Sequence, residues 1–254
     1  MLPRSKKTMK FGKRLKQQVD DTLPDWRDKF LSYKDLKKLL RLISNNVDVI
    51  NNNADADFVC LLNSEIDKFN SFFVEQEEDL VIRHRELRQR ILESWGPRGN
   101  EMDDHKQEIR EDIVNLHGEM VLLLNYSNLN YTGLGKILKK YDKRTGGLLR
   151  LPFIQSILQQ PFYKTDSLSK MIKDCEVSID AIFPTPKQQF NNENKPNISV
   201  GSEGIFRNTV SALLSLEEIR RRSSTYSHFS LPPLNLPDSD LIHSFQLNSP
   251  IPIL

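Results

Sequence analysis

The segment LGKILKKYDKRTG, residues 134–146, combines lysine with a spacing that suits the binding of an anion. Its four lysines recur at i, i+3, i+4 and i+7, which places their ammonium groups on one face of an α-helix; they are Lys136, Lys139, Lys140 and Lys143. Apolar residues occupy the opposite face: Leu134, Ile137, Leu138 and Tyr141. Like charges at this spacing destabilise a helix. A multivalent anion would offset that repulsion, and the flexible lysine side chain adapts to several phosphate positions.

Two other segments show the same separation of basic and apolar residues. In YKDLKKLLR, a basic arc faces an apolar stripe of Leu36, Leu39, Leu40 and Ile43; the arc consists of Lys34, Lys37, Lys38 and Arg41. Tyr33 lies one turn before Lys37, where its hydroxyl could donate a directional hydrogen bond. The segment MKFGKRLK adds Lys10, Lys13, Arg14 and Lys16. The sequence leaves two interpretations open: three solvated faces in unrelated directions, or three faces that converge on one anion.

The overall charge makes local clustering the important signal. The formal net charge of the 254-residue chain is only +2, so its global field is weak. The basic segments lack interleaved aromatic residues and a recognisable reading motif, so direct nucleic-acid binding is not expected. The alternative function is a basic adaptor for nucleic acid or for membrane phosphoinositides, because the basic N-terminus suits an anionic surface.

Catalytic and metal-binding patterns have little support in this sequence. The five histidines show no metal-ligand spacing, and the segment from Asp142 to Gly147 resembles a calcium loop without the later acidic ligands. Gly133 to Lys136 does not have the spacing of a P-loop. Cys60 and Cys175 are expected to be reduced thiols, since two distant cysteines suggest neither a zinc site nor a disulfide framework. We therefore predict a protein that is not an enzyme and holds no metal or cofactor.

The elements that must position the basic faces are helical. The apolar spacing predicts helices over 9–23, 26–44 and 57–94, then a helix with the stripe Ile109, Ile113, Leu116, Met120 and Leu123, and shorter helices over 150–160 and 166–182. A loop is expected at 45–57, a turn at 95–103 and a glycine stop at 145–147. The polar segment 125–133 is expected to interrupt regularity before the lysine helix. Two long helices joined by a short turn favour an antiparallel hairpin in a bundle, and no strand is predicted.

The last part of the chain differs in composition. Residues 184–254 hold eight of the 13 prolines with many Ser and Asn, which predicts a mostly disordered tail. A short helix is expected near 206–222, with Phe206, Val210, Leu213 and Leu214 on one face. The sequence leaves open whether it docks on the bundle or binds a partner. The chain has no apolar stretch long enough for a signal peptide or a membrane span, so no transmembrane segment and an intracellular location are expected.

Four segments of the chain resemble the SPX domain family, most closely the stand-alone plant SPX proteins. The opening MKFGKRLKQQVDDTLPDWRDKFLSYKDLKKLL and the closing HGEMVLLLNYSNLNYTGLGKILKKYDKRTG are similar to the two ends of an SPX domain. LLRLPFIQSILQQPFY and SSTYSHFSLPPLNLP extend the similarity. It implies a leader at 1–8, an SPX domain at 9–183 and the tail at 184–254. The implied all-α fold is an N-terminal helical hairpin packed on a three-helix bundle with two long helices, plus short C-terminal helices.

The resemblance also implies a ligand and a partner. The ligand is an inositol pyrophosphate or hexakisphosphate that reports phosphate status. The family's central phosphate-binding cluster matches Tyr33, Lys37 and Lys140, and its neighbouring lysine surface cluster matches Lys136, Lys139 and Lys143. Lys10 would lie at the edge of the ligand. The implied partner is a MYB-type coiled-coil transcription factor of the phosphate-starvation response, sequestered when the ligand is bound, in the nucleus or the cytoplasm.

Overall fold

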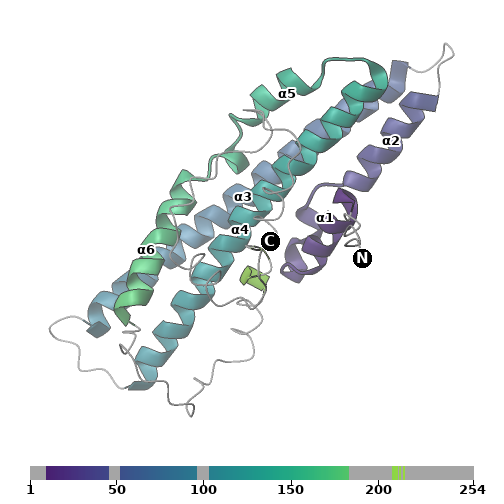
Figure 1. Cartoon of the computed structure of the whole chain (residues 1–254). Helices are drawn as coiled ribbons and strands as arrows, with labels where there is room; N and C mark the ends of the chain where they lie inside the picture. Colours follow the sequence, from purple (N-terminus) through teal and green to yellow (C-terminus); the bar gives the residue numbers. More distant parts are fainter. Residues whose placement is uncertain are drawn as a thin grey trace, which may run out of the picture. The chain divides into compact units, whose positions relative to one another are not determined.

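The chain is mostly helical in the part that the computed structural model describes, which is residues 10–45, 52–95, 103–182, 208–210, 212 and 214. No strand occurs in these ranges, and the predicted all-α fold is confirmed. The elements in chain order are α1 (Phe11–Asp20), η1 (Pro24–Lys29), α2 (Tyr33–Asn45), α3 (Asn52–Trp95), α4 (Asp103–Thr145), α5 (Arg150–Ile157), η2 (Pro161–Tyr163) and α6 (Asp166–Ile182) (Figure 1).

The described residues form two compact units, and the long helices α3 and α4 contribute to both. The first unit contains residues 10–45, 52–76 and 125–164. The second contains residues 77–95, 103–124 and 165–182, together with the described residues between 208 and 214. None of the described helices is long and apolar enough to cross a membrane. The predicted domain limits stay a prediction, and the leader and most of the tail lie outside the described residues.

The core of the first unit joins the N-terminal hairpin to the two long helices. Apolar residues of α3 spaced three or four positions apart are buried: Phe58, Leu62, Ile66, Phe69 and Phe73. Tyr126 of α4 lies against Phe30, with ring centroids 4.9 Å apart, and its hydroxyl donates to the Lys29 carbonyl at 3.1 Å. Trp26 packs edge-on against Phe72 of α3. Each fully buried aromatic or aliphatic side chain contributes roughly 1.5–3 kcal/mol, so these contacts fix the hairpin on α3 and α4.

The predicted irregularity at 125–133 is wrong, because α4 runs unbroken through it. The polar side chains of this segment are buried, and two of them, Tyr126 and Asn130, form hydrogen bonds with the N-terminal hairpin. Asn130 is fully buried, and its Oδ1 accepts a hydrogen bond from the Leu31 amide at 2.9 Å. Buried polar groups need such partners, and here the partner lies 99 residues away in sequence. The polar residues therefore mark a docking surface within the helix.

The prediction of one continuous helix over 26–44 is also wrong. It is divided into η1 and α2 by an extended stretch at 30–32. The amides of Leu31 and Ser32 leave the helical pattern to donate to Asn130 of α4 and to Glu65 of α3, the latter at 2.8 Å. The Ser32 carbonyl then accepts the first bonds of α2, from Asp35 and Leu36. Tertiary hydrogen bonds thus set where α2 begins.

The loop expected at 45–57 is wrong in its last part, because the first turns of α3 lie there. The helix begins at Asn52 rather than at Asp57, while residues 46–51 lie outside the described part. Ala54 is buried, and Asp55 accepts the Tyr141 hydroxyl at 2.7 Å. The Tyr141 ring also stacks on Phe58, with centroids 4.9 Å apart. These contacts with α4 extend the helix through residues whose composition favours a loop.

The glycine stop at the end of α4 is confirmed. Thr145 is the last helical residue, and Gly146 adopts a φ of +73°, which residues with a Cβ rarely adopt. The Gly146 amide donates to the Asp142 carbonyl at 2.9 Å. The Asp142 carboxylate accepts the backbone amides of Leu149 and Arg150, so the segment with a faint likeness to a calcium loop is a helix-to-helix connection.

In the second unit, α6 packs with the parts of α3 and α4 assigned to that unit. The predicted stripe on α4 is buried, including Ile109, Ile113 and Leu116, and Leu168, Ile172 and Cys175 of α6 are buried as well. The chain contacts α4 again in the region expected to form a short helix. Thr209 and Ala212 are buried there, and the Thr209 hydroxyl donates to the Gly118 carbonyl at 3.5 Å.

The predicted apolar face of that short helix stays a prediction, because only two of its four residues have described side chains, and Val210 is half-buried. Leu214 is 59% exposed, whereas Thr209 and Ala212 are covered. Small side chains permit close approach of two backbones, and Gly118, itself buried, lies opposite Thr209. Phe206 and Leu213, which belong to the predicted face, lie outside the residues whose side chains are described.

Candidate anion-binding site

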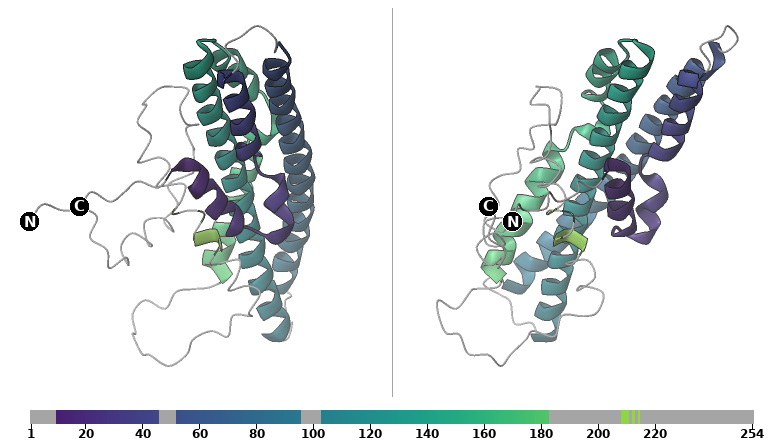
Figure 2. Two further views of the ribbon diagram at one scale, coloured as in Figure 1. Left: turned by 90° about the vertical axis from the view of Figure 1, so that its right-hand side faces the viewer. Right: turned by 45° about the vertical axis from the view of Figure 1, so that its right-hand side comes forward.

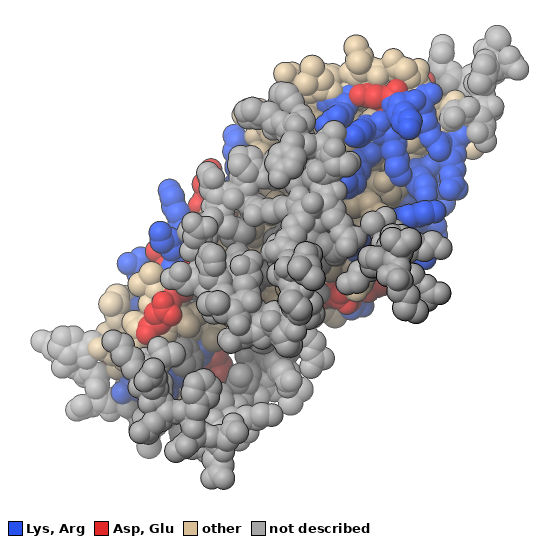
Figure 3. Space-filling model, viewed as in Figure 1, with Lys and Arg blue, Asp and Glu red and all other residues tan. Residues whose placement is uncertain are grey.

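The predicted site residues lie on three helices of the first unit. Tyr33 is the first residue of α2, and Lys37 follows one turn later. The lysines of LGKILKKYDKRTG occupy the final turns of α4 and are exposed, while Lys10 is the N-cap residue of α1. Figure 3 shows Lys and Arg gathered over α2 and the end of α4. In Figures 1 and 2, α2 runs beside the start of α3 and the end of α4.

Two lysines of α4 lie over aromatic rings of α1 and α2. The Lys140 ammonium is 5.3 Å from the centroid of the Tyr33 ring, and the Lys136 ammonium is 5.3 Å from that of Phe11. Phe11 and Tyr33 meet edge to face at 5.2 Å. An exposed cation–π contact contributes roughly 0.5–1 kcal/mol. The alternation of lysine and ring links α1, α2 and α4 and orients both ammonium groups at one surface.

Electrostatic repulsion shows that the basic faces converge. The pKa of Lys37 is lowered below its usual value by the charge of Arg41 first, then by Lys140, partial burial, Lys10 and Arg144. Partial burial lowers the pKa of Lys136, and the charges of Lys139, Arg14 and Lys140 lower it further. These cations come from α1, α2 and α4. The interpretation of three faces in unrelated directions therefore does not hold for the described residues.

Three carboxylates near this face have partners of their own. Asp35 pairs with Lys38 at 2.8 Å. Asp55 accepts the Tyr141 hydroxyl, and Asp142 accepts the backbone amides at the start of α5. None of these three forms an ion pair with Lys37 or Lys140 in the described structure. The repulsion at the centre of the face is thus left uncompensated by these acids, which is the arrangement expected of a surface that takes up an external anion.

The structure adds two residues to the predicted site and shows that Arg14, a basic residue of the N-terminal segment, is not on its exposed surface. Arg144 of α4 and the Phe11 ring belong to the convergent face, and neither was singled out as a site residue from sequence. Both residues lie on other helices than α2, and sequence periodicity does not show which helices pack together. Arg14 is only 9% exposed, so it lies beneath the face rather than on it. Lys143 is exposed, and no described contact joins it to the other lysines.

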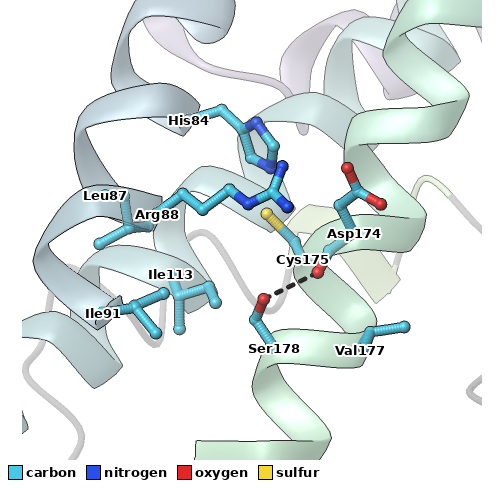
Figure 4. Close-up of a pocket in the computed structure, with 9 residues that line it drawn as sticks. All are labelled: His84, Leu87, Arg88, Ile91, Ile113, Asp174, Cys175, Val177 and Ser178. Carbon is cyan, nitrogen blue, oxygen red and sulfur yellow. Dashed lines mark hydrogen bonds between the residues drawn. The ribbon is translucent and has the colours of Figure 1, made fainter. Parts of the chain in front are cut away.

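A cavity in the second unit contains a histidine and a cysteine, which are residue types that can take part in catalysis. It has a volume of about 150 Å³ and is lined by His84, Leu87, Arg88, Ile91, Ile113, Asp174, Cys175, Val177 and Ser178 (Figure 4). Burial raises the pKa of the Cys175 thiol to about 12, so the thiol is protonated and a poor nucleophile. Burial lowers the pKa of His84. No group of three or more metal-ligating side chains occurs among the described residues.

Comparison with known proteins identifies one family for this chain. An SPX domain model matches residues 9–48 and 92–157. SPX domain-containing protein 3 of Arabidopsis thaliana is 55% identical over 252 residues, which cover 96% of this chain and 100% of that one. SPX domain-containing protein 5 of Oryza sativa subsp. indica is 55% identical over 240 residues, which cover 94% of each chain.

A solved structure has the same fold. The SPX domain of Chaetomium thermophilum glycerophosphodiester phosphodiesterase 1, in complex with inositol hexakisphosphate, matches with a TM-score of 0.59 and 24% identity. The match covers 68% of this chain and 99% of that one. The fold and the surface define an all-α domain with a convergent cationic face. The chain belongs to the SPX domain family.

Proposed function

We propose that the protein is a non-enzymatic sensor that binds an inositol polyphosphate or pyrophosphate on the basic face of α1, α2 and α4. The observation that carries this proposal is the repulsion at Lys37, whose pKa is lowered by Arg41, Lys140, Lys10 and Arg144 from three helices. A ligand with many phosphates converts that repulsion into attraction. The related fold that was solved with inositol hexakisphosphate supports the same class of ligand.

The roles of the residues are taken from the family resemblance, and two contacts support them. Tyr33, Lys37 and Lys140 would form the central cluster; the Lys140 ammonium lies over the Tyr33 ring, and its charge acts on Lys37. The surrounding cluster consists of Lys136, Lys139 and Lys143, and Lys10 contributes from the edge. A hydrogen bond from one cation to a phosphate oxygen contributes roughly 1.5–3 kcal/mol, which is a small part of the roughly 8 kcal/mol that micromolar binding requires. Affinity therefore depends on many cations acting on one ligand.

We further propose that the occupied protein sequesters a MYB-type coiled-coil transcription factor and thereby represses phosphate-starvation responses in the nucleus or the cytoplasm. This step rests on the resemblance to stand-alone plant SPX proteins. The ligand would promote it only through its higher affinity for the conformation that binds the factor. Neutralisation of the basic face is the physical change that distinguishes the two states of the surface.

Titration calorimetry with inositol hexakisphosphate tests the ligand assignment. Lys37→Ala and Lys140→Ala should each weaken binding about tenfold or more, because a hydrogen bond to a charged group contributes roughly 1.5–3 kcal/mol. Tyr33→Phe should weaken it less. Lys173→Ala, which removes an exposed lysine of α6, is the matched control and should bind as the wild type does. Unchanged affinity in all three site variants would refute the assignment.

A separate experiment tests the partner. Complex formation between the protein and a MYB coiled-coil factor, measured by analytical ultracentrifugation, should increase with the concentration of inositol hexakisphosphate. Association that does not depend on the ligand would refute the sensor mechanism even if the anion site is correct. Tight binding to duplex DNA in a gel shift, or to phosphoinositide vesicles in sedimentation, would instead favour the adaptor function.

A further inference from the structure

Two arginines repeat the central lysine pair one helical turn further along the same helices. Arg41 follows Lys37 by four residues on α2, and Arg144 follows Lys140 by four residues on α4. Four residues of α-helix rise about 6 Å. Both arginines are exposed. The basic face therefore has two successive levels: a lysine level beside Tyr33, and an arginine level towards the end of α4.

The structure holds the arginine level together. Arg144 Nη1 donates to the Leu40 carbonyl at 3.5 Å, which places its guanidinium beside the residue that precedes Arg41. Tyr141, one turn earlier on α4, is fixed by its hydrogen bond to Asp55 and its stacking on Phe58. This turn of α4 is thus anchored to α3, while its arginine reaches α2.

The two guanidinium groups retain most of their hydrogen-bonding capacity. Arg144 uses one donor in its contact with Leu40, and a guanidinium has five. Among the described residues, neither Arg41 nor Arg144 forms an ion pair with a carboxylate. Both lie close enough to Lys37 for their charges to act on it. An exposed pair of like charges in this arrangement suits a further anionic group next to the one at Lys37.

We propose that Arg41 and Arg144 form a subsite for the terminal phosphate of a pyrophosphate group, next to the lysine level that holds the monophosphates of the inositol ring. This inference rests on the proposed function and adds a reason why the protein would bind a ligand with a diphosphate group more tightly than one with monophosphates alone. A diphosphate projects further from the ring than a monophosphate does. The planar guanidinium fork matches the oxygens of a terminal phosphate, whereas lysine acts as a point charge.

Calorimetric titration with two ligands tests the subsite. The wild type should bind diphosphoinositol pentakisphosphate more tightly than inositol hexakisphosphate. In Arg41→Ala/Arg144→Ala, affinity for the diphosphate ligand should fall about tenfold or more, since a lost hydrogen bond to a charged group corresponds to at least this factor. Affinity for inositol hexakisphosphate should fall much less, so the preference should disappear.

Two further variants separate geometry from charge. Arg41→Lys/Arg144→Lys keeps both charges but removes the forks, so affinity for the diphosphate ligand should fall more than affinity for inositol hexakisphosphate, and the preference should be reduced. Lys173→Ala should change neither affinity. Circular dichroism of each variant verifies that it is folded.

Three results would overturn the subsite: equal losses for both ligands in the alanine variant, a full preference in the lysine variant, or no preference in the wild type. The proposed function fails separately if the wild type binds neither ligand.

Discussion

Asn130 links the fold to the anion-binding face, and its replacement by alanine is the most direct test of that link. Its Oδ1 accepts the Leu31 amide at 2.9 Å, two residues before Tyr33 opens α2. Asn130 is 0% exposed, so water cannot replace the lost acceptor. The substitution leaves the amide of Leu31 buried without a partner.

The magnitude follows from three contributions. An unsatisfied buried donor costs roughly 1–3 kcal/mol. The Asn130 Nδ2 has no hydrogen-bond partner in the structure, so its removal relieves part of that cost. Alanine also has a higher helix propensity than asparagine, by up to about 0.7 kcal/mol. The free energy of unfolding should therefore fall by about 1–2 kcal/mol, which corresponds to a Tm lower by about 2–8 °C for a chain of this size.

Thermal unfolding monitored by circular dichroism measures this change. Gln155→Ala, which removes an exposed amide on α5, is the matched control and should leave Tm unchanged. A Tm for Asn130→Ala equal to that of the control would show that the Leu31 amide does not depend on this acceptor. The argument that buried polar residues of α4 dock the N-terminal hairpin would then be refuted.

Three further predictions concern other parts of the chain. Gly146→Ala should lower stability by about 1–2 kcal/mol because of its positive φ, whereas Gly135→Ala, with open space around its Cβ, should be neutral or stabilising; urea unfolding of both variants decides this. A thiol-reactive dye should rapidly label Cys60 but not Cys175 in the native protein, and both after denaturation, since Cys175 is buried with a pKa of about 12; rapid native labelling of both would contradict the structure. Burial lowers the pKa of His84 below its ordinary 6.5, so the unfolded chain binds the proton first. Its contribution to stability should thus be complete above the ordinary pKa and be lost as the pH falls through the lowered one. The urea concentration at the midpoint of unfolding should fall on acidification, and His84→Gln should make this fall smaller. An unchanged pH dependence in the variant would refute this.

The parts of the fold that could be predicted from sequence are those set by local periodicity. The spacing of Phe58, Leu62 and Phe69 requires one buried face, and the structure buries all three. Gly146 ends α4 because its backbone conformation favours glycine over any other residue. Such features depend on residues within one or two turns, so the sequence around them contains the necessary information.

The errors arose where distant residues decide the local structure. Asparagines favour loops in isolation, yet Asn130 stabilises a helix here because its side chain binds Leu31, far away in the chain. Ser32 likewise leaves a helical pattern because Glu65 accepts its amide. Periodicity also identified the lysine face of α4 and the basic arc of α2, but it could not place Arg144 beside Leu40. That requires the packing of α2 against α4.

The cationic face lies on helices that buried contacts hold in place against the repulsion of its charges. Two unit charges 4 Å apart in water repel by about 1 kcal/mol, and salt screens exposed pairs further. Two hydrogen bonds oppose this repulsion: the Leu31 amide donates to Asn130, and the Ser32 amide donates to Glu65. Leaving either buried amide without a partner would cost roughly 1–3 kcal/mol. Burial of the Tyr33 ring, only 7% exposed, adds to them. The backbone of the site is therefore in place before a ligand binds. A polyphosphate that binds there need only replace repulsion by attraction, and its binding free energy is not spent on assembling α2 against α4.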